Sequence, residues 1–376
     1  MDPCISLLRA LIAIDSVNPS LVAGAKGEGV IADAIAEHMR RVGLDVHLQK
    51  VVQDRPNVIG LLEGRMPGRS LMLCGHMDTV GVEGMNAPFD PVEKHGRVYG
   101  RGSQDMKGGL AAMIDAARII ADRGLEKGRL ILATVVDEEY ASLGADALVS
   151  SWTADGAIVT EPTDLQVGVG HKGFAWLEVE TFGRAAHGSR PRDGRDAVMR
   201  MGRVLGRLEA LDRELQARPP HPMMETGSLH ASIISGGREL SSYPDRCVLQ
   251  LERRTVAGED ASGALAEVQR ILADLSASDP EFRATVQLTF SRPPYELAAG
   301  HRLSRGLVAA ASHEGIDTRP VGMSFWTDAA VLAGAGIPSV LFGPGGAGLH
   351  STEEYVTVAD VIACREALVR FAMEWC

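Results

Sequence analysis

Acidic and imidazole side chains follow several short apolar segments of this sequence, where they could bind metal ions. His76 and Asp78 follow the apolar run Leu71–Cys74, with Gly75 between the run and His76. Side chains two residues apart on an extended segment point to the same face, so the two could act together. A carboxylate beside a histidine commonly fixes the tautomer of a metal-binding imidazole. The alternative is a polar strand end without a ligand role.

A second candidate is Asp105, which lies within the glycine-rich segment Gly100–Gly109. Glycines on both sides allow the backbone to bend tightly, which would place Asp105 at the start of the following helix. A carboxylate there could bind a metal ion, or it could be the N-cap of that helix in an ordinary turn. Asp105 taken alone fits both interpretations.

Three consecutive acidic residues, Asp137, Glu138 and Glu139, end the apolar segment 130–136. So many buried carboxylates are costly unless a cation or water compensates their charge. Glu161 ends the next apolar segment in the same way. His350 lies in a loop after a later one.

These donors share a chemistry and a predicted location. Oxygen and nitrogen ligands without cysteine fit zinc, with cobalt or manganese as alternatives. Two such ions close together can activate a water and polarise a carbonyl oxygen, and a nearby carboxylate can be the general base. Because ligand sites of open α/β sheets lie at the carboxyl ends of the strands, one crevice could collect all five polar segments.

The elements that must position these residues alternate between helix and strand patterns in the first part of the chain. Apolar residues recur at helical spacing from Val30 to Val42, and Gly43 ends that helix. We further predict strands at Asn57–Leu62, Ser70–Gly75, Arg129–Val136 and Ala157–Val159, and helices at Gly108–Asp122 and Gly144–Ser150. Near-continuous apolar strands alternating with helices predict an α/β fold, in which a mostly parallel sheet has helices on both faces.

The middle of the chain has a different order, β-α-β-β-α-β, which is the ferredoxin-like α+β arrangement. Its predicted elements are Phe174–Phe182, Asp196–Gln216, Ser228–Ser235, Cys247–Arg253, Glu259–Ser276 and Ala284–Phe290. The tail returns to helices at His301–His313, Thr327–Ala335 and Ala359–Trp375, with a strand at Ser339–Phe342. We therefore expect residues 173–292 to form a domain inserted into a larger catalytic domain of residues 1–172 and 293–376.

Composition narrows the function classes. The 376 residues carry a formal net charge of -11, which disfavours nucleic acid as a partner. No apolar run approaches the roughly 20 residues of a membrane helix, so we expect no membrane partner. The five cysteines are scattered, and no basic region precedes the first apolar stretch. Both features lead us to expect a cytoplasmic protein with reduced thiols.

Taken together, the motifs resemble those of one enzyme family: the aminoacylase, acetylornithine deacetylase, succinyl-diaminopimelate desuccinylase and glutamate carboxypeptidase family of dinuclear zinc hydrolases. The resemblance spans essentially the whole chain, and the pieces occur in family order. The matching pieces are His76–Asp78, Gly102–Gly108, Asp137–Glu139, Glu161–Thr163, Gly183–His187 and His350 with Glu354.

The resemblance implies a role for each site residue. His76, Asp105 and Glu161 would hold one divalent ion. Asp105, Glu139 and His350 would hold the other, with Asp105 bridging the two. Glu138 would be the general acid and base, and Asp78 would orient His76. The Asp105–Met106 peptide bond is expected to be cis.

The resemblance also assigns the inserted domain to homodimer formation, and gives it two functional residues. His187 would stabilise the oxyanion, often in the partner's active site, and Arg254 would bind a substrate carboxylate. Ala257 replaces the commoner proline of the arginine motif. The adjacent Arg253 is an alternative anchor, and either arginine could instead be an exposed strand charge.

Several functions remain to be compared. The leading prediction is hydrolysis of the amide bond of an N-acyl amino acid that has a free carboxylate. A carboxypeptidase or dipeptidase acting on small peptides is the alternative, and an inactive relative that serves as a binding module is a remote one.

The run Gly343–Gly348 matches G-x-G-x-x-G, but we expect no dinucleotide site because a loop, not a helix, is predicted to follow it.

Overall fold

The computed structural model describes residues 2–376, and it divides into two compact units. The first unit comprises the residues up to Val169 together with Leu297–Val321 and Thr327–Cys376. The second comprises Gly170–Glu296 and Gly322–Trp326. The predicted inserted domain covered residues 173–292, so the observed second unit extends a few residues further at each end and adds a short later segment.

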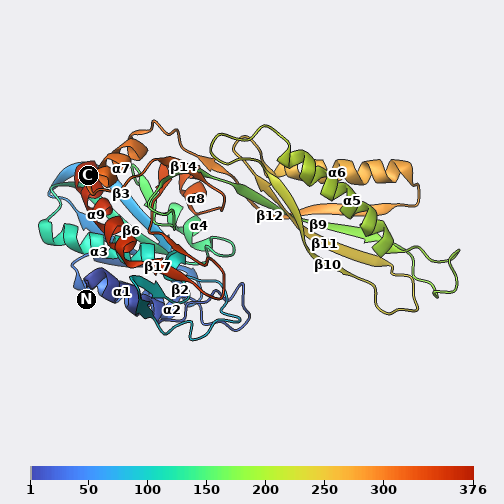
Figure 1. Ribbon diagram of the computed structural model, residues 1–376, viewed down its shortest axis with the longest axis horizontal. Coiled ribbons are helices and arrows are strands. Elements are labelled where there is room, and N and C mark those ends of the chain that lie inside the picture. The colour runs from blue at the N-terminus through green and yellow to red at the C-terminus, as the bar shows by residue number, and fades with distance from the viewer. Residues whose placement is uncertain (1) are drawn as a thin grey trace. The chain divides into compact units, whose positions relative to one another are not determined.

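The first unit is built on a mixed sheet with the strand order β1-β2-β6-β3-β7-β15-β8. Figure 1 labels its strands β2, β6 and β3. The strands β6, β3, β7 and β15 pair in parallel, whereas β1, β2 and β8 pair antiparallel to their neighbours. Their bounds are β1 Asp45–Val52, β2 Arg55–Glu63, β3 Met66–His76, β6 Lys127–Val135, β7 Ala157–Val159, β8 Val167–His171 and β15 Ser339–Leu341.

Helices cover both faces of this sheet. On one face, Gly60 of β2 lies against Met39 of α2 and against Leu44. On the opposite face, the side chain of Asn57 in β2 donates to the backbone carbonyl of Gly144 in α4. The helices are α1 Pro3–Ile12, α2 Gly29–Arg41, α3 Gly108–Arg123, α4 Leu143–Val149, α7 Arg302–His313, α8 Ala329–Gly334 and α9 Val358–Trp375. The predicted α/β fold with a parallel centre and helices on both faces is confirmed.

A small antiparallel sheet also belongs to the first unit, in the order β16-β17-β5-β4. Its strands are β4 Val92–Lys94, β5 Arg97–Tyr99, β16 Gly346–Ala347 and β17 Tyr355–Thr357. The loop between β16 and β17 carries His350 and Glu354. The glycine-rich run 343–348 therefore leads into this loop and not into a helix.

The second unit has a four-stranded antiparallel sheet in the order β10-β11-β9-β12. Its elements are β9 Gly173–Phe182, α5 Ala197–Gln216, β10 Ser228–Gly236, β11 Arg246–Thr255, α6 Ala261–Ser278 and β12 Arg283–Arg292. Apolar side chains of both helices and of one sheet face, such as Val179, Val204 and Val268, form its core. This is the ferredoxin-like order that the sequence predicts.

Two further short strands lie near the ends of the second unit, β13 Tyr295–Glu296 and β14 Pro320–Met323. Asp196 and Asp260 begin α5 and α6 as N-caps, because each side chain accepts a backbone N–H three residues later.

Among the helices of residues 2–376, none combines the length and apolar character that crossing a membrane requires.

Candidate metal centre

The parallel strands bring three predicted ligands to one edge of the first unit's sheet, and a helical turn brings a fourth. His76 is the last residue of β3, Glu139 follows β6, and Glu161 follows β7. Parallel neighbours end on the same side, so these side chains converge. Asp105 enters from η1 (Ser103–Lys107), a short irregular helical turn that leads into α3.

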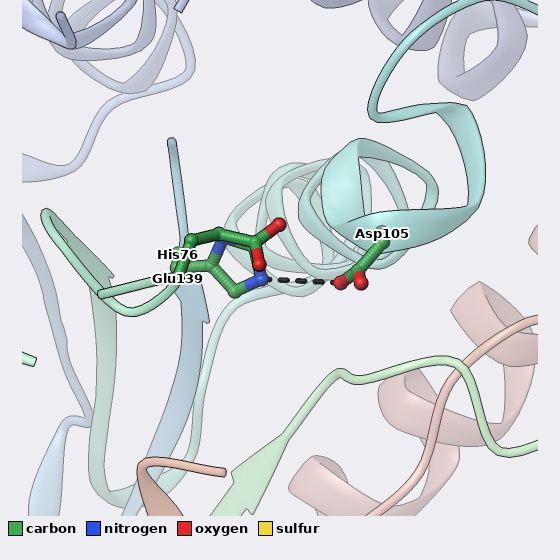
Figure 2. Close-up of side chains that lie close together, drawn as sticks. All are labelled: His76, Asp105 and Glu139. Carbon is green, nitrogen blue, oxygen red and sulfur yellow. Dashed lines mark hydrogen bonds and ion pairs between the residues drawn. The ribbon is translucent and has the colours of Figure 1, made fainter. Parts of the chain in front are cut away.

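Asp105 lies between two histidines. Its Oδ1 is 3.2 Å from His76 Nε2, a contact drawn in Figure 2, and its Oδ2 is 3.4 Å from His350 Nε2. His350 Nε2 is also 3.2 Å from Glu139 Oε2. A carboxylate that reaches a nitrogen on each side has the geometry of a bridging ligand between two cations.

The remaining two glutamates lie on the His76 side of the cluster. Glu138 Oε2 and Glu161 Oε1 are each 4.0 Å from His76 Nε2. Two donor sets therefore share His76: one with Asp105 and Glu139, the other with Glu138 and Glu161, and within each set the ligand atoms lie within 4.8 Å of one another.

The electrostatics of this cluster fit a bound cation. Burial raises the pKa of Glu138 and of Glu161 well above the ordinary glutamate value, and it raises the pKa of Glu139 to about 6. Burial opposes ionisation of Asp105 as well, but His350 and His76 hold its pKa below the ordinary value. Asp105 and Glu139 in turn raise the pKa of His350 to about 10. Buried carboxylates this close together need compensating positive charge.

The approach of Asp105 to His76 depends on Gly75, which leaves room for the turn, and on the carboxylate of Glu354, which binds the backbone of the turn. A side chain at Gly75 would lie 2.7 Å from Met106 and 2.9 Å from Leu110, so glycine there admits the turn. Glu354 Oε1 accepts the backbone N–H groups of Gln104 and Asp105, at 2.9 and 3.1 Å.

Two expectations about this turn can now be compared with the structure. The Asp105–Met106 peptide bond is cis, as the family resemblance implied. Asp105 is not the N-cap of α3, because Lys107 occupies that position and makes no side-chain capping bond.

Asp78 does more than the sequence analysis assigned to it. Its backbone carbonyl is the nearer acceptor for His76 Nδ1, at 3.0 Å, and its carboxylate Oδ1 lies at 3.5 Å. The carboxylate accepts the backbone N–H groups of Glu138 and Glu139, at 3.2 and 3.1 Å. Asp78 thus holds the turn that carries both glutamates as well as the imidazole.

The other predicted residues belong to the second unit. His187 is exposed, and its Nδ1 contacts Ser189; it lines an open hollow of about 470 Å³ with Arg190 and Asp193. Arg253 is 2% exposed and pairs with Glu259 and Glu267.

Arg254 differs from its neighbour. Its side chain is 32% exposed, its Nε donates to Glu252, and its guanidinium lies over the Phe174 ring. A buried, fully paired Arg253 is a structural residue of the second unit. Of the two arginines, Arg254 is the one accessible to a ligand.

Several residues that support the site carry no signal in the sequence. Glu354 was recognised only as part of a motif, and its partner Arg101, 2.6 Å away, was not singled out. Asn18, Glu28 and Arg55 were not noticed either. Their side chains meet the site across sequence separations of 60 to 119 residues, and no local pattern announces such contacts.

Comparison with known proteins agrees with the geometry. The profile of the peptidase family M20/M25/M40 matches residues 72–374. An acetylornithine deacetylase of Myxococcus xanthus is 30% identical and aligns over 92% of each chain. The N-formyl-4-amino-5-aminomethyl-2-methylpyrimidine deformylase of Bacillus subtilis (strain 168) is 28% identical, over 100% of this chain and 95% of the relative.

A solved structure shares the fold. The M20 family metallo-carboxypeptidase Sso-CP2 of Sulfolobus solfataricus superposes with a TM-score of 0.82 and 17% identity, over 100% of this chain and 99% of that chain. The predicted family resemblance and the predicted enzyme class, a metal-dependent hydrolase, are confirmed by these matches. The chain belongs to the peptidase family M20/M25/M40.

Proposed function

We propose that the chain hydrolyses the amide bond of N-acyl amino acids that have a free carboxylate, with two divalent metal ions, most suitably zinc. The observation that carries the proposal is the position of Asp105 between His76 and His350, with buried glutamates on both sides. In this assignment His76, Asp105 and Glu161 hold one ion. Asp105, Glu139 and His350 hold the second.

The residues divide the chemistry between them. When bound, the two ions supply Lewis acidity to the substrate carbonyl and to the attacking water. Glu138 takes a proton from that water and delivers it to the amine nitrogen as the C–N bond breaks, which leaves a carboxylate and a free amine. Burial raises the pKa of Glu138, and a raised pKa suits a carboxylate that must both accept and return a proton near neutral pH.

The second unit is proposed to recognise the substrate. Arg254 has a partly exposed guanidinium that can make paired hydrogen bonds to a carboxylate. His187 is exposed in a hollow and can donate to an oxyanion. Arg253 is excluded from the first role because its nitrogens already bind Glu259, Glu267 and a backbone carbonyl.

The names of the relatives favour an acyl group over a peptide. Two relatives at 28–30% identity are called a deacetylase and a deformylase, and both names describe removal of a small acyl group. The peptidases among the solved structures are 21% identical or less, so they support the fold alone. An inactive binding module is disfavoured because all six proposed catalytic and metal-binding residues are present.

A substrate panel tests the proposal. The purified protein, supplied with zinc or cobalt, is assayed for amine release from N-acetyl, N-succinyl and N-formyl amino acids and from dipeptides. We expect turnover of one N-acyl class, and loss of turnover when its carboxylate is converted to an amide. Turnover of dipeptides alone would establish the peptidase alternative, and no turnover with bound metal would favour the inactive relative.

We also propose that the protein forms a homodimer through its second unit. Strand β10 is a sheet edge, and Ile233 and Ile234 on it are 61% and 53% exposed. An exposed apolar edge strand is suited to pairing with a second copy. Sedimentation equilibrium should give a dimer that Ile234→Lys weakens, and a monomeric parent protein would contradict the proposal.

A further inference from the structure

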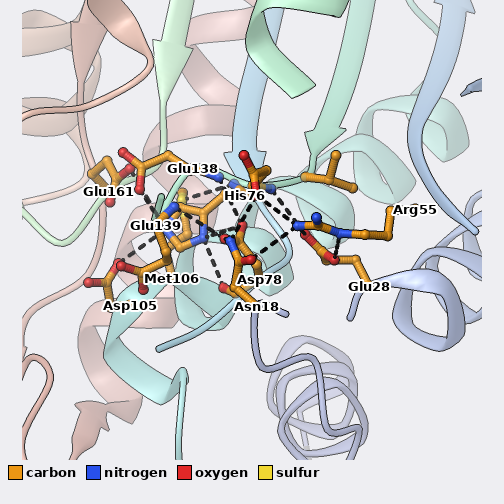
Figure 3. A network of polar contacts seen from close by, with 12 residues as sticks. Asn18, Glu28, Arg55, His76, Asp78, Asp105, Met106, Glu138, Glu139 and Glu161 are labelled. Atoms are coloured by element: carbon orange, nitrogen blue, oxygen red, sulfur yellow. Dashed lines mark hydrogen bonds and ion pairs between the residues drawn. The ribbon is translucent and has the colours of Figure 1, made fainter. Parts of the chain in front are cut away.

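A buried polar network lies behind the metal centre, on the opposite side of His76 from Asp105. Figure 3 shows how the contacts continue from the cluster through Asp78 to Asn18, Arg55 and Glu28. We call these three residues, together with Asp78 and Asp137, the support network. All five side chains are buried, and Arg55 supplies the positive charge among three carboxylates.

Arg55 binds two of those carboxylates at once. Its Nε donates to Glu28 Oε2 at 2.6 Å, and its Nη2 lies 2.8 Å from Glu28 Oε1 and 2.9 Å from Asp137 Oδ1. The paired contact with Glu28 is the planar, two-bond arrangement that guanidinium makes and ammonium does not. Glu28 and Asp137 therefore depend on this one side chain for their charge compensation.

Asn18 joins that ion cluster to the residue beside the proposed metal ligands. Its Nδ2 donates to Asp78 Oδ2 at 2.8 Å and lies 3.2 Å from Asp137 Oδ1. Its Oδ1 accepts from Arg55 Nη2 at 3.3 Å. The amide thus links Arg55 to Asp78 through two successive hydrogen bonds.

The network ends on the turn that carries both catalytic-site glutamates. Three successive backbone N–H groups there donate to buried carboxylates: Asp137 to Glu28 at 3.0 Å, and Glu138 and Glu139 to Asp78 at 3.2 and 3.1 Å. Asp137 has φ +68°, in the left-handed region that aspartate adopts more readily than most residues other than glycine. Its conformation turns the chain so that these three N–H groups face the buried carboxylates.

We propose that Arg55 is a positioning residue for hydrolysis: through Glu28, Asp137 and Asn18 it fixes the direction in which Glu138 and Glu139 leave their turn. The inference rests on the proposed function, because it assigns work to the turn that carries the proposed base and a proposed metal ligand. Arg55 itself is separated from the cluster by Asp78 and Asn18 and contacts none of the proposed ligands.

Removal of the guanidinium would disturb the turn in a defined way. Glu28 and Asp137 would lose the guanidinium that joins them, so neither carboxylate would be held in place beside the turn. The Asp137 N–H, which donates to Glu28, would then be held less firmly, and Glu138 and Glu139 would shift with it. Loss of a group that orients metal ligands from behind typically lowers metal affinity or activity by about 10- to 100-fold.

The test compares Arg55→Met and Arg55→Lys with a matched control, Arg365→Met. Arg365 is also a buried arginine of the first unit and binds Asp115 at 3.0 Å and Asp2 at 2.8 Å, away from the support network. For each protein, zinc affinity is measured by chelator competition. Then kcat and KM are measured at saturating zinc with the best N-acyl amino acid, and thermal unfolding is followed without metal.

We expect Arg55→Met and Arg365→Met both to unfold at lower temperature, and only Arg55→Met to lose zinc affinity and kcat, each by about tenfold or more, with KM close to the parent value. Arg55→Lys should fall between Arg55→Met and the parent, because one ammonium cannot make the paired contact with Glu28 and also reach Asp137. If Arg55→Met is insoluble, Arg55→Lys decides.

A soluble Arg55 variant with parental zinc affinity and kcat would overturn the inference. An equal loss of both quantities in Arg365→Met would overturn it too, since the effect would then be general destabilisation. A parent protein that binds no metal and hydrolyses nothing would instead refute the proposed function, so the two failures are distinguishable.

Discussion

Substitution of Glu138 by glutamine should separate the base from the metal ligands. The change keeps the shape of the side chain and removes only its capacity to accept a proton. Glu138 is 11% exposed and lies 4.0 Å from His76 Nε2, so solvent water is a poor replacement for it. General acid and base catalysis is worth about 10² to 10⁴ in rate, which corresponds to about 3 to 5 kcal/mol of activation free energy.

Two further measurements show whether that loss is chemical. Zinc content should stay at the parent level in Glu138→Gln and fall in Glu139→Gln, because Glu139 is the glutamate 3.2 Å from His350. Without metal, the Glu138→Gln protein should unfold at a temperature no lower than that of the parent protein. Burial raises the pKa of Glu138, so the ionised carboxylate destabilises the native state and the neutral amide relieves that cost.

The assay is steady-state hydrolysis of the best N-acyl amino acid at saturating zinc, with metal content determined by elemental analysis. A Glu138→Gln protein that keeps its metal and turns over at the parental rate would refute the assignment of the base. A protein that loses metal instead of rate would show that Glu138 and Glu139 have exchanged roles.

Three other predictions concern the second unit. Arg254→Lys should lose about tenfold to a few hundredfold in kcat/KM toward substrates with a free carboxylate, and much less toward their amides, because charged hydrogen bonds contribute about 1.5–3 kcal/mol each. If Arg253→Lys shows this loss and Arg254→Lys does not, Arg253 is the residue that binds the carboxylate. His187→Ala should lower kcat by about 10²- to 10³-fold. If His187 acts in the partner's active site, mixing His187→Ala with Glu138→Gln protein should restore some activity. A mixture that stays inactive after demonstrated subunit exchange would exclude action across a dimer. Burial lowers the pKa of His171 to about 4, so the unfolded chain binds this proton first as the pH falls below about 6.5. That difference should cost the native state about 2 kcal/mol by pH 5 in urea unfolding, a loss that His171→Asn should remove.

The convergence of the proposed ligands was predictable from sequence because their positions follow local rules. His76 ends a buried strand, Glu139 and Glu161 lie within a few residues of the ends of two others, and parallel strands end on the same side. A motif therefore carries both the chemistry and the location. The fold class and the ferredoxin-like order could be predicted because hydrophobic periodicity, which distinguishes helices from strands, is also a local signal.

The supporting residues were not predictable, since their contacts are long-range and their chemistry is ordinary. Arg55 and Glu28 are single charged residues that nothing in the sequence distinguishes from surface charges, and only the fold buries them together. The carboxylate of Asp78 was expected to orient His76 alone, and its contacts with two backbone N–H groups depend on a turn 60 residues away. Strand β1 was missed because none of its residues is fully buried, half of them are exposed and its apolar pattern is weak.

Helix α1 was missed for a different reason. Its signals are present, because Asp2 accepts the N–H of Cys4 as an N-cap and Pro3 occupies the first turn. An aspartate followed by proline at the start of an apolar segment is a local start signal, so this helix was predictable from sequence.

The central claim is that two metal ions, held by one pre-folded cluster, are required for amide hydrolysis. The most direct measurement is a zinc titration of the chelated protein, in which hydrolysis of an N-acyl amino acid, bound zinc and far-ultraviolet circular dichroism are followed together. The ligands come from separate segments of a unit with its own core, so the spectrum should hardly change while activity returns only as the second equivalent binds. Full activity in protein that contains no transition metal, or maximal activity at one equivalent, would contradict the account.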